Sequence, residues 1–175
     1  MHIIGVMILI VLGGAAAALL AMRYKIKTEE KRKYYRAAQR ILREEYLDGA
    51  IKNAESMGLY SNEQRMMIAL KMQGNKGMGY VFDPAREVRI GRCRERNDIC
   101  VQDLATSGEH CKIFLYEGQL CIEDLNSSNG TICKRRFGGT QTLLGKMAFL
   151  QNHTRIKVGN NCFILTIFYC DVSAE

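Results

Sequence analysis

Three short motifs hold the side chains of this chain that are best suited to grip an anion. They are Gly91-Arg92, Ser107-Gly108-Glu109-His110 and Asn126-Ser127-Ser128-Asn129-Gly130-Thr131. Arginine presents planar, permanently charged donors, and short hydroxyl side chains and backbone N–H groups on tight turns can surround phosphate oxygens. Each motif alone is also typical of an ordinary turn, and Asn-Gly above all is a hairpin signal. In this order, between short strands, the combination is far more specific.

The residues that most enzymes require are sparse. The three histidines, at positions 2, 110 and 153, lack metal-ligand spacing, and no G-x-x-x-x-G-K-[ST] or G-x-S-x-G motif occurs. Ser107 and His110 could form a nucleophile and base, but the sequence indicates no third orienting group. We therefore expect a protein that is not an enzyme and that uses no cofactor and no metal.

The elements that position these motifs are short strands. After Ser61 the sequence changes to apolar runs separated by Gly, Asn and Asp. The runs of strand length are 65–72, 79–82, 87–90, 99–101, 111–116, 119–124, 131–133, 146–150, 155–158 and 162–169. Many short strands with frequent turns predict a sandwich or barrel, here an all-β sandwich of about eleven strands over residues 61–175.

A long apolar segment precedes this region. Residues 3–22 contain no charged or strongly polar side chain, and 20 residues are enough to cross a bilayer as a helix. The alternatives are a buried core helix, which usually has a polar stripe, and a cleaved signal peptide, which usually has a basic start. We expect a transmembrane helix over residues 1–22.

The charge distribution predicts the orientation of that helix. Residues 23–46 hold nine basic and four acidic residues, so most of the net charge of +7 lies there, whereas no Lys or Arg precedes the apolar run. The positive-inside rule then places the N-terminus outside and residues 23–175 in the cytosol, in a single-pass protein of the cell membrane. The seven cysteines agree, because their odd number and scattered spacing suit a reducing compartment. Because the basic charge lies beside the membrane segment, we expect no nucleic-acid partner.

A second helix is predicted over residues 28–57, within a basic juxtamembrane segment at 23–60. Thr28 is a candidate N-cap, Gly58 a candidate stop, and apolar residues recur at three- and four-residue steps. That stripe consists of Tyr35, Ala38, Leu42, Tyr46, Ala50 and Ala54. It suits self-association, contact with anionic headgroups, packing on the following domain, or a plain spacer.

Residues 64–171 resemble the forkhead-associated (FHA) family. The resemblance rests on Ile90-Gly91-Arg92, Asn97-Asp98-Ile99, Ser107-x-x-His110, Asp124-Leu125-x-Ser127-Ser128-Asn129-Gly130-Thr131, Leu150 and Ile156-x-Val158-Gly159. It implies a β-sandwich that binds phosphothreonine peptides through loops at one end. It further implies that Arg92, Ser107 and Ser128 contact the phosphate and that Asn129 binds the peptide backbone. Gly108 belongs to the same binding set, while Gly91, His110, Gly130 and Thr131 hold the loops.

The chain departs from the family pattern in three places, which together comprise four residues. Gly108 stands where Arg, Lys or Asn is common, Lys134 where a further Asn often follows, and His153-Thr154 where Gly-Asp is usual. Basic residues that could compensate by attracting an acidic peptide are Arg94, Arg96, Lys134, Arg135 and Arg136. They are equally typical of solvated loops.

The sequence thus predicts a membrane-anchored adaptor. It would bind a phosphothreonine-containing protein, the substrate of a Ser/Thr protein kinase, and recruit it to the cytosolic face of the membrane. Possible self-association would involve residues 28–57. The alternative is a phosphate-independent scaffold in a membrane or secretion complex.

Overall fold

The computed structural model describes residues 2–52, 64–74 and 79–171, and within the N-terminal helix it describes the side chains of residues 14–45. The chain divides into two compact units, Met1–Ala37 and Ala38–Glu175. The predicted domain boundaries, 1–22, 23–60 and 61–175, remain predictions.

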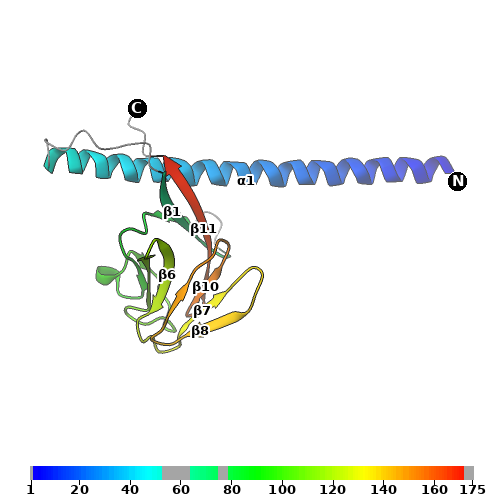
Figure 1. Cartoon of the computed structure of the whole chain (residues 1–175). Coiled ribbons are helices and arrows are strands. Elements are labelled where there is room, and N and C mark those ends of the chain that lie inside the picture. Colours follow the sequence, from blue (N-terminus) through cyan, green and yellow to red (C-terminus); the bar gives the residue numbers. More distant parts are fainter. Residues whose placement is uncertain (1, 53–63, 75–78, 172–175) are drawn as a thin grey trace. The chain divides into compact units, whose positions relative to one another are not determined.

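One continuous helix, α1 (His2–Lys52), replaces the two helices predicted from the sequence (Figure 1). Thr28 was predicted to be an N-cap, but it lies inside α1, where its Oγ1 donates a hydrogen bond to the Tyr24 carbonyl at 2.9 Å. No proline interrupts the helix, and the charged residues after position 22 are good helix formers. The predicted continuation over 53–57 lies outside the described residues.

Within the described side chains of α1, no stretch combines the length and the apolar character needed to cross a bilayer. The first part of the predicted span, residues 3–13, lies outside those side chains.

Part of the predicted apolar stripe of α1 is buried. Ala38 and Leu42 are 0% and 5% exposed, whereas Tyr46, Ala50 and Ala54 lie outside the described side chains. Glu45, also in this part of the helix, accepts from Arg65 at 3.0 Å and lies 3.3 Å from Arg86.

The described residues after α1, 64–74 and 79–171, form two sheets with eleven strands, as the sequence predicts (Figure 1). The six-stranded sheet has the order β2 (Gly79–Phe82), β1 (Gln64–Met72), β11 (Asn161–Asp171), β10 (Arg155–Val158), β7 (Thr131–Lys134) and β8 (Thr140–Leu143). The five-stranded sheet has the order β4 (Ile99–Cys100), β3 (Val88–Gly91), β5 (Cys111–Tyr116), β6 (Gln119–Asp124) and β9 (Met147–Phe149). All pairs are antiparallel except β3 with β4, and a short 3-10 helix, η1 (Arg94–Arg96), separates those two strands.

Ten of the eleven strands correspond to predicted runs, with ends that differ by up to two residues. The eleventh, β8, was missed because its sequence, Thr-Gln-Thr-Leu, has no apolar alternation. It is an edge strand in which Leu143 alone is buried, so the hydrogen bonds to β7 rather than side-chain burial define it.

Strand alternation builds the core between the sheets. In β10, Ile156 and Val158 are fully buried while Arg155 and Lys157 are exposed. The same register places Phe163 and Leu165 of β11 inside. This core fixes the strands from which the candidate loops project.

Candidate functional site

The topology brings the three predicted motifs to one end of the sandwich. Strand β5 is antiparallel to both β3 and β6, so the end of β3, the start of β5 and the end of β6 share one edge. The loops at 92–98, 101–110 and 125–130 therefore meet there. Strand β7 begins at the same end, because the last loop leads directly into Thr131.

Ser107 and Ser128 contact each other across two of these loops. The Ser128 N–H donates to Ser107 Oγ at 3.0 Å, and the two hydroxyl oxygens lie 3.4 Å apart. Both groups retain further hydrogen-bonding capacity, because a hydroxyl has one donor and two acceptor positions. The pair thus presents two adjacent hydroxyls.

Arg92 is fixed beside this pair through its backbone. Its N–H donates to the Ser107 carbonyl at 2.9 Å. The residue is exposed, and its guanidinium forms no ion pair with any residue that the structure describes. An arginine with this freedom is available to an external anion.

His110 is buried next to the hydroxyl pair and links two of the loops. It is 0% exposed; its Nδ1 accepts the Ser107 N–H at 3.1 Å, and its Nε2 lies 3.2 Å from the Gly130 carbonyl. An accepting Nδ1 requires the neutral ring with its proton on Nε2, which then donates to Gly130. The ring therefore joins the loop carrying Ser107 to the turn after Asn129.

Asp124 organises the third loop, although sequence reasoning gave it no role. Its buried carboxylate accepts from Ser127 N–H at 3.0 Å and Oγ at 2.7 Å, from Thr131 Oγ1 at 2.7 Å, and from Gly145 N–H at 3.0 Å. Burial raises the pKa of this carboxyl, but the four hydrogen bonds outweigh that effect and lower the pKa below its ordinary value. The available signal was its place three residues before Ser127, the spacing of a side-chain-capped turn.

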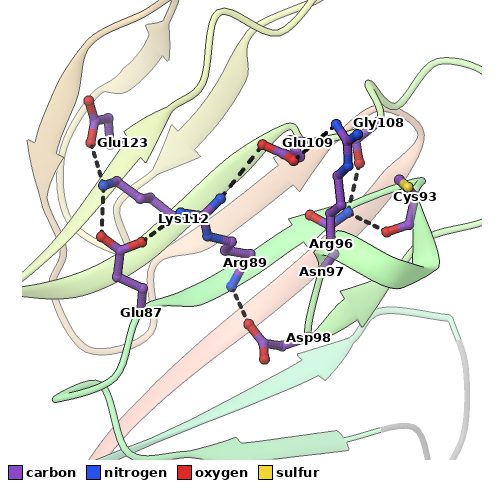
Figure 2. A network of polar contacts seen from close by, with 10 residues as sticks. All are labelled: Glu87, Arg89, Cys93, Arg96, Asn97, Asp98, Gly108, Glu109, Lys112 and Glu123. Carbon is purple, nitrogen blue, oxygen red and sulfur yellow. Dashed lines mark hydrogen bonds and ion pairs between the residues drawn. The ribbon is translucent and has the colours of Figure 1, made fainter.

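Asn97 ties the loop after β3 to the loop before β5 (Figure 2). Its Nδ2 donates to the Cys93 carbonyl at 2.6 Å and to the Gly108 carbonyl at 2.7 Å, and Cys93 N–H donates to the same Gly108 carbonyl at 2.9 Å. Gly91 lies against this junction, where an added Cβ would be 2.4 Å from the Gly108 oxygen. Only glycine fits there. Sequence reasoning placed Asn97 in the motif without assigning it this role.

A network of ion pairs lies beside the site on β3, β5 and β6 and includes Glu87, the residue before β3 (Figure 2). Lys112 pairs with Glu87 at 2.9 Å and Glu123 at 3.3 Å, and Glu87 also pairs with Arg89 at 3.1 Å. The hydrogen bond with Lys112 is the main reason that the pKa of Glu87 is lowered and that of Lys112 raised.

The structure places the basic residues expected near the motifs in two separate groups. Arg96 pairs with Glu109 at 3.5 Å, so part of its charge is neutralised (Figure 2). Lys134 is the last residue of β7, at the opposite end of that strand from Thr131, and Arg135 and Arg136 follow it. Their predicted help in attracting a peptide to the loops is therefore not supported, whereas Arg94 lies in η1 on the loop after β3.

Asn129 is positioned by a separate group of contacts. Its Nδ2 donates to the Ala105 carbonyl at 2.8 Å, and Asp103 in turn accepts from the Ala105 N–H at 3.1 Å and the Asn160 N–H at 2.7 Å. The Asn160 N–H is the largest cause that lowers the pKa of Asp103. Asp103 thus fixes the loop on which Asn129 rests.

Comparison with known proteins identifies the pattern. The FHA domain model matches residues 88–159. An FHA domain-containing protein of Arabidopsis thaliana is 31% identical over 90 residues, which are 51% of this chain and 22% of that protein. The match thus spans less than a quarter of the plant protein's length.

Two solved structures resemble the sandwich. The FHA domain of an Arabidopsis thaliana hypothetical protein has 25% identity and a TM-score of 0.50, and the match covers 66% of this chain and 93% of that one. Mycobacterium tuberculosis EmbR, solved with a low-affinity phosphopeptide, has 23% identity and a TM-score of 0.51, covering 73% of this chain and 30% of its own. The sandwich of this chain therefore has the FHA fold, and the FHA domain is matched over residues 88–159.

Proposed function

We propose that this chain is a membrane-anchored adaptor that binds phosphothreonine peptides and recruits a Ser/Thr-kinase-phosphorylated partner to the cytosolic face of the membrane. The observation that carries the proposal is the pairing of Ser107 and Ser128 across two loops, with the backbone of Arg92 bonded to Ser107. The EmbR structure, which has the same fold, holds a phosphopeptide.

The chemistry of the loops suits a phosphorylated residue. A phosphothreonine carries about −1.5 to −2 charges at neutral pH and three strong acceptor oxygens. The unpaired guanidinium of Arg92 supplies charge, while the hydroxyls of Ser107 and Ser128 supply neutral donors. Asn129 keeps its side-chain carbonyl available for a peptide N–H, because its Nδ2 is already bonded to Ala105.

The membrane part of the proposal rests on the sequence. The apolar stretch at 3–22 has the length of a bilayer-spanning helix, and the basic residues that follow it favour a cytosolic FHA domain with the N-terminus outside. Tethering would hold the phosphopeptide site close to membrane-bound kinases and their substrates. Self-association through residues 28–57 belongs to the same proposal.

One observation favours a second candidate, a phosphate-independent scaffold. Gly108 offers no side chain to a peptide, and its carbonyl already accepts from Cys93 and Asn97. A site with fewer side-chain contacts binds phosphate less tightly, so the same loop end would serve as an assembly surface.

A peptide screen on the full chain in detergent micelles separates the two candidates. Matched libraries with phosphothreonine or threonine at the central position are compared, using wild type, Arg92→Ala and the control Arg40→Ala, an exposed arginine of α1. We expect binding to require the phosphate and to weaken by about 2–5 kcal/mol in Arg92→Ala, because the bound phosphate loses its charged partner. Equal binding of both libraries supports the scaffold, and unchanged affinity in Arg92→Ala rejects the proposed site.

A further inference from the structure

A second basic site lies away from the phosphopeptide loops, where the β7–β8 hairpin meets β10. It is a hollow of about 410 Å³ lined by Lys134, Arg135, Arg136, His153, Arg155 and Ile164, here called the basic pocket. Its volume falls within the range of small-molecule sites. Because Lys134 and Thr131 are at opposite ends of β7, roughly 10 Å of strand separates the pocket from the loop that carries Ser128.

The strand register builds this pocket on the outer face of the six-stranded sheet. Arg155 is opposite Lys134 on β7 and opposite Ile164 on β11, so the three side chains form one row across the sheet. The residues that alternate with them, Cys133 and Ile156, are buried in the core. The row therefore faces solvent on a rigid support (Figure 1 shows β7 between β8 and β10).

The lining of the basic pocket is positively charged and contains no carboxylate. Four of its lining residues are Lys or Arg, none is Asp or Glu, and none of the four forms an ion pair with another described residue. Like charges on neighbouring side chains repel one another, and the repulsion is relieved when an anion binds among them. The arginines of the pocket also have the planar donor geometry that matches phosphate oxygens.

An exposed aromatic residue stands beside these charges. Phe137 is 86% exposed in the turn between β7 and β8, and the Arg136 guanidinium lies 5.3 Å from the centre of its ring. Exposed rings next to basic residues are typical of segments that lie at a lipid–water interface.

We propose that the basic pocket binds a phosphate-bearing headgroup, independently of the phosphopeptide loops. The shared chemistry is a phosphate monoester with about two negative charges, supplied either by a phosphorylated inositol lipid or by a soluble inositol phosphate. Binding at this pocket leaves Arg92, Ser107 and Ser128 free. A lipid source would hold the hairpin tip against the bilayer, with Phe137 at the interface.

The chain contains no tryptophan, so Phe137→Trp introduces a single fluorescent reporter at an exposed position beside the pocket. The full-length reporter protein is reconstituted in phosphatidylcholine vesicles with or without phosphatidylinositol phosphate, and in a second arm neutral vesicles are titrated with inositol trisphosphate. We expect the emission of the reporter to respond in at least one arm. A blue shift with the lipid alone identifies a lipid source, and a response to inositol trisphosphate identifies a soluble one.

Two further variants of the reporter decide whether the pocket is responsible. Arg135→Glu reverses a pocket charge in an exposed turn, and Lys146→Glu makes the same change of charge outside the pocket. We expect Arg135→Glu to weaken the response about tenfold and Lys146→Glu to leave it unchanged, with equal thermal stability of the two. No response in either arm, or equal weakening by both substitutions, overturns the proposal.

Discussion

At the scale of single residues, the candidate site depends on groups that the ligand would never touch. Gly91 packs against the carbonyl of Gly108 and the amide of Asn97, and His110 uses both ring nitrogens to join Ser107 to Gly130. These buried contacts set the positions of the hydroxyls and of the Arg92 backbone. A change beneath the site should therefore affect binding as strongly as a change within it.

The first prediction concerns Gly91→Ala. A Cβ at this position would lie 2.4 Å from the Gly108 oxygen, so the loops after β3 and before β5 must separate. We expect the free energy of unfolding to fall by about 1–3 kcal/mol and the affinity for phosphothreonine peptides to fall with it. Circular dichroism melts and peptide titration measure the two effects.

The control for that substitution is Gly139→Ala. An added Cβ there meets no atom within 4 Å, and the φ angle of Gly139 is not in the left-handed region. We expect Gly139→Ala to keep the stability and affinity of wild type. If Gly91→Ala behaves in the same way, the close packing at Gly91 does not control the loops.

The motifs predicted which loops lie together. They did not predict the hydrogen bonds that hold those loops in place. The resemblance to the FHA family, which rests on the motifs that contain Arg92, Ser107 and Ser128, placed these residues at one end of a sandwich. Asp124 and Asn97 received no role, because their importance comes from hydrogen bonds to backbone groups distant in sequence, such as Gly145 and Gly108. Such partners depend on the final register of the strands, which local sequence does not specify.

At the scale of elements, the loop at 101–106 is bound to a turn of the other sheet. Asp103 accepts hydrogen bonds from the N–H and side chain of Asn160 in the turn between β10 and β11, at 2.7 and 3.0 Å. Gly159 leaves room for this contact, because a Cβ there would lie 2.4 Å from Asp103 Oδ2. One carboxylate thus joins the two sheets at the site end.

The second prediction is that Asp103→Ala frees this loop without unfolding the sandwich. The N–H groups of Ala105 and Asn160 both donate to the Asp103 carboxylate and would lose that acceptor. We expect faster hydrogen exchange at these two amides and weaker phosphopeptide binding, because Asn129 rests on the Ala105 carbonyl. Exchange measured by NMR on the full chain in micelles provides the readout.

Gln102→Ala is the matched control for Asp103→Ala, since Gln102 is exposed in the same loop. It should leave the exchange rates of Ala105 and Asn160 unchanged. Unaltered exchange in Asp103→Ala would contradict the assigned role, and equal acceleration by both substitutions would mean that the loop is loose for another reason.

Strands were predictable where the burial of their side chains produces a recognisable pattern of apolar residues in the sequence. The alternation in β10 and the apolar run in β11 predicted those strands, whereas the polar edge strand β8 carried no such signal. In α1 the change from apolar to charged residues suggested two helices. Helix propensity depends on individual residues, however, and nothing near Thr28 breaks the backbone hydrogen bonds.

At the scale of the whole molecule, acid should weaken the sandwich through Asp124. Its pKa is lowered in the folded protein, so its stabilisation is fully present above the unfolded value of about 3.9. That contribution is lost as the pH falls through the folded pKa, because the protonated acid can no longer accept all four hydrogen bonds. The free energy of unfolding should therefore decrease below about pH 4.

The third prediction tests that assignment with Asp124→Asn. The amide keeps the size of the carboxyl but loses its charge, so we expect a loss of about 1–3 kcal/mol at neutral pH. The difference from wild type should narrow in acid, where the wild-type carboxyl is also neutral. Thermal unfolding followed by circular dichroism from neutral to acid pH measures both curves. Parallel curves would show that another group governs acid sensitivity.

The fourth prediction concerns the placement of the whole chain in a membrane. All seven cysteines lie between positions 93 and 170, so His2→Cys adds a thiol on the far side of the apolar segment 3–22. If that segment spans the bilayer as proposed, a membrane-impermeant maleimide labels His2→Cys in intact cells and leaves the wild-type chain unlabelled until the cells are permeabilised.

Each other labelling result contradicts that placement in a different way. Labelling of the wild-type chain in intact cells puts the β-sandwich outside, the result expected for a cleaved signal peptide or an inverted helix. Labelling of both chains only after permeabilisation means that position 2 and the β-sandwich lie on the same side of the membrane, so segment 3–22 does not span it. In either case the proposed phosphopeptide site is independent of the membrane proposal, because the contacts that position Arg92, Ser107 and Ser128 lie within the sandwich.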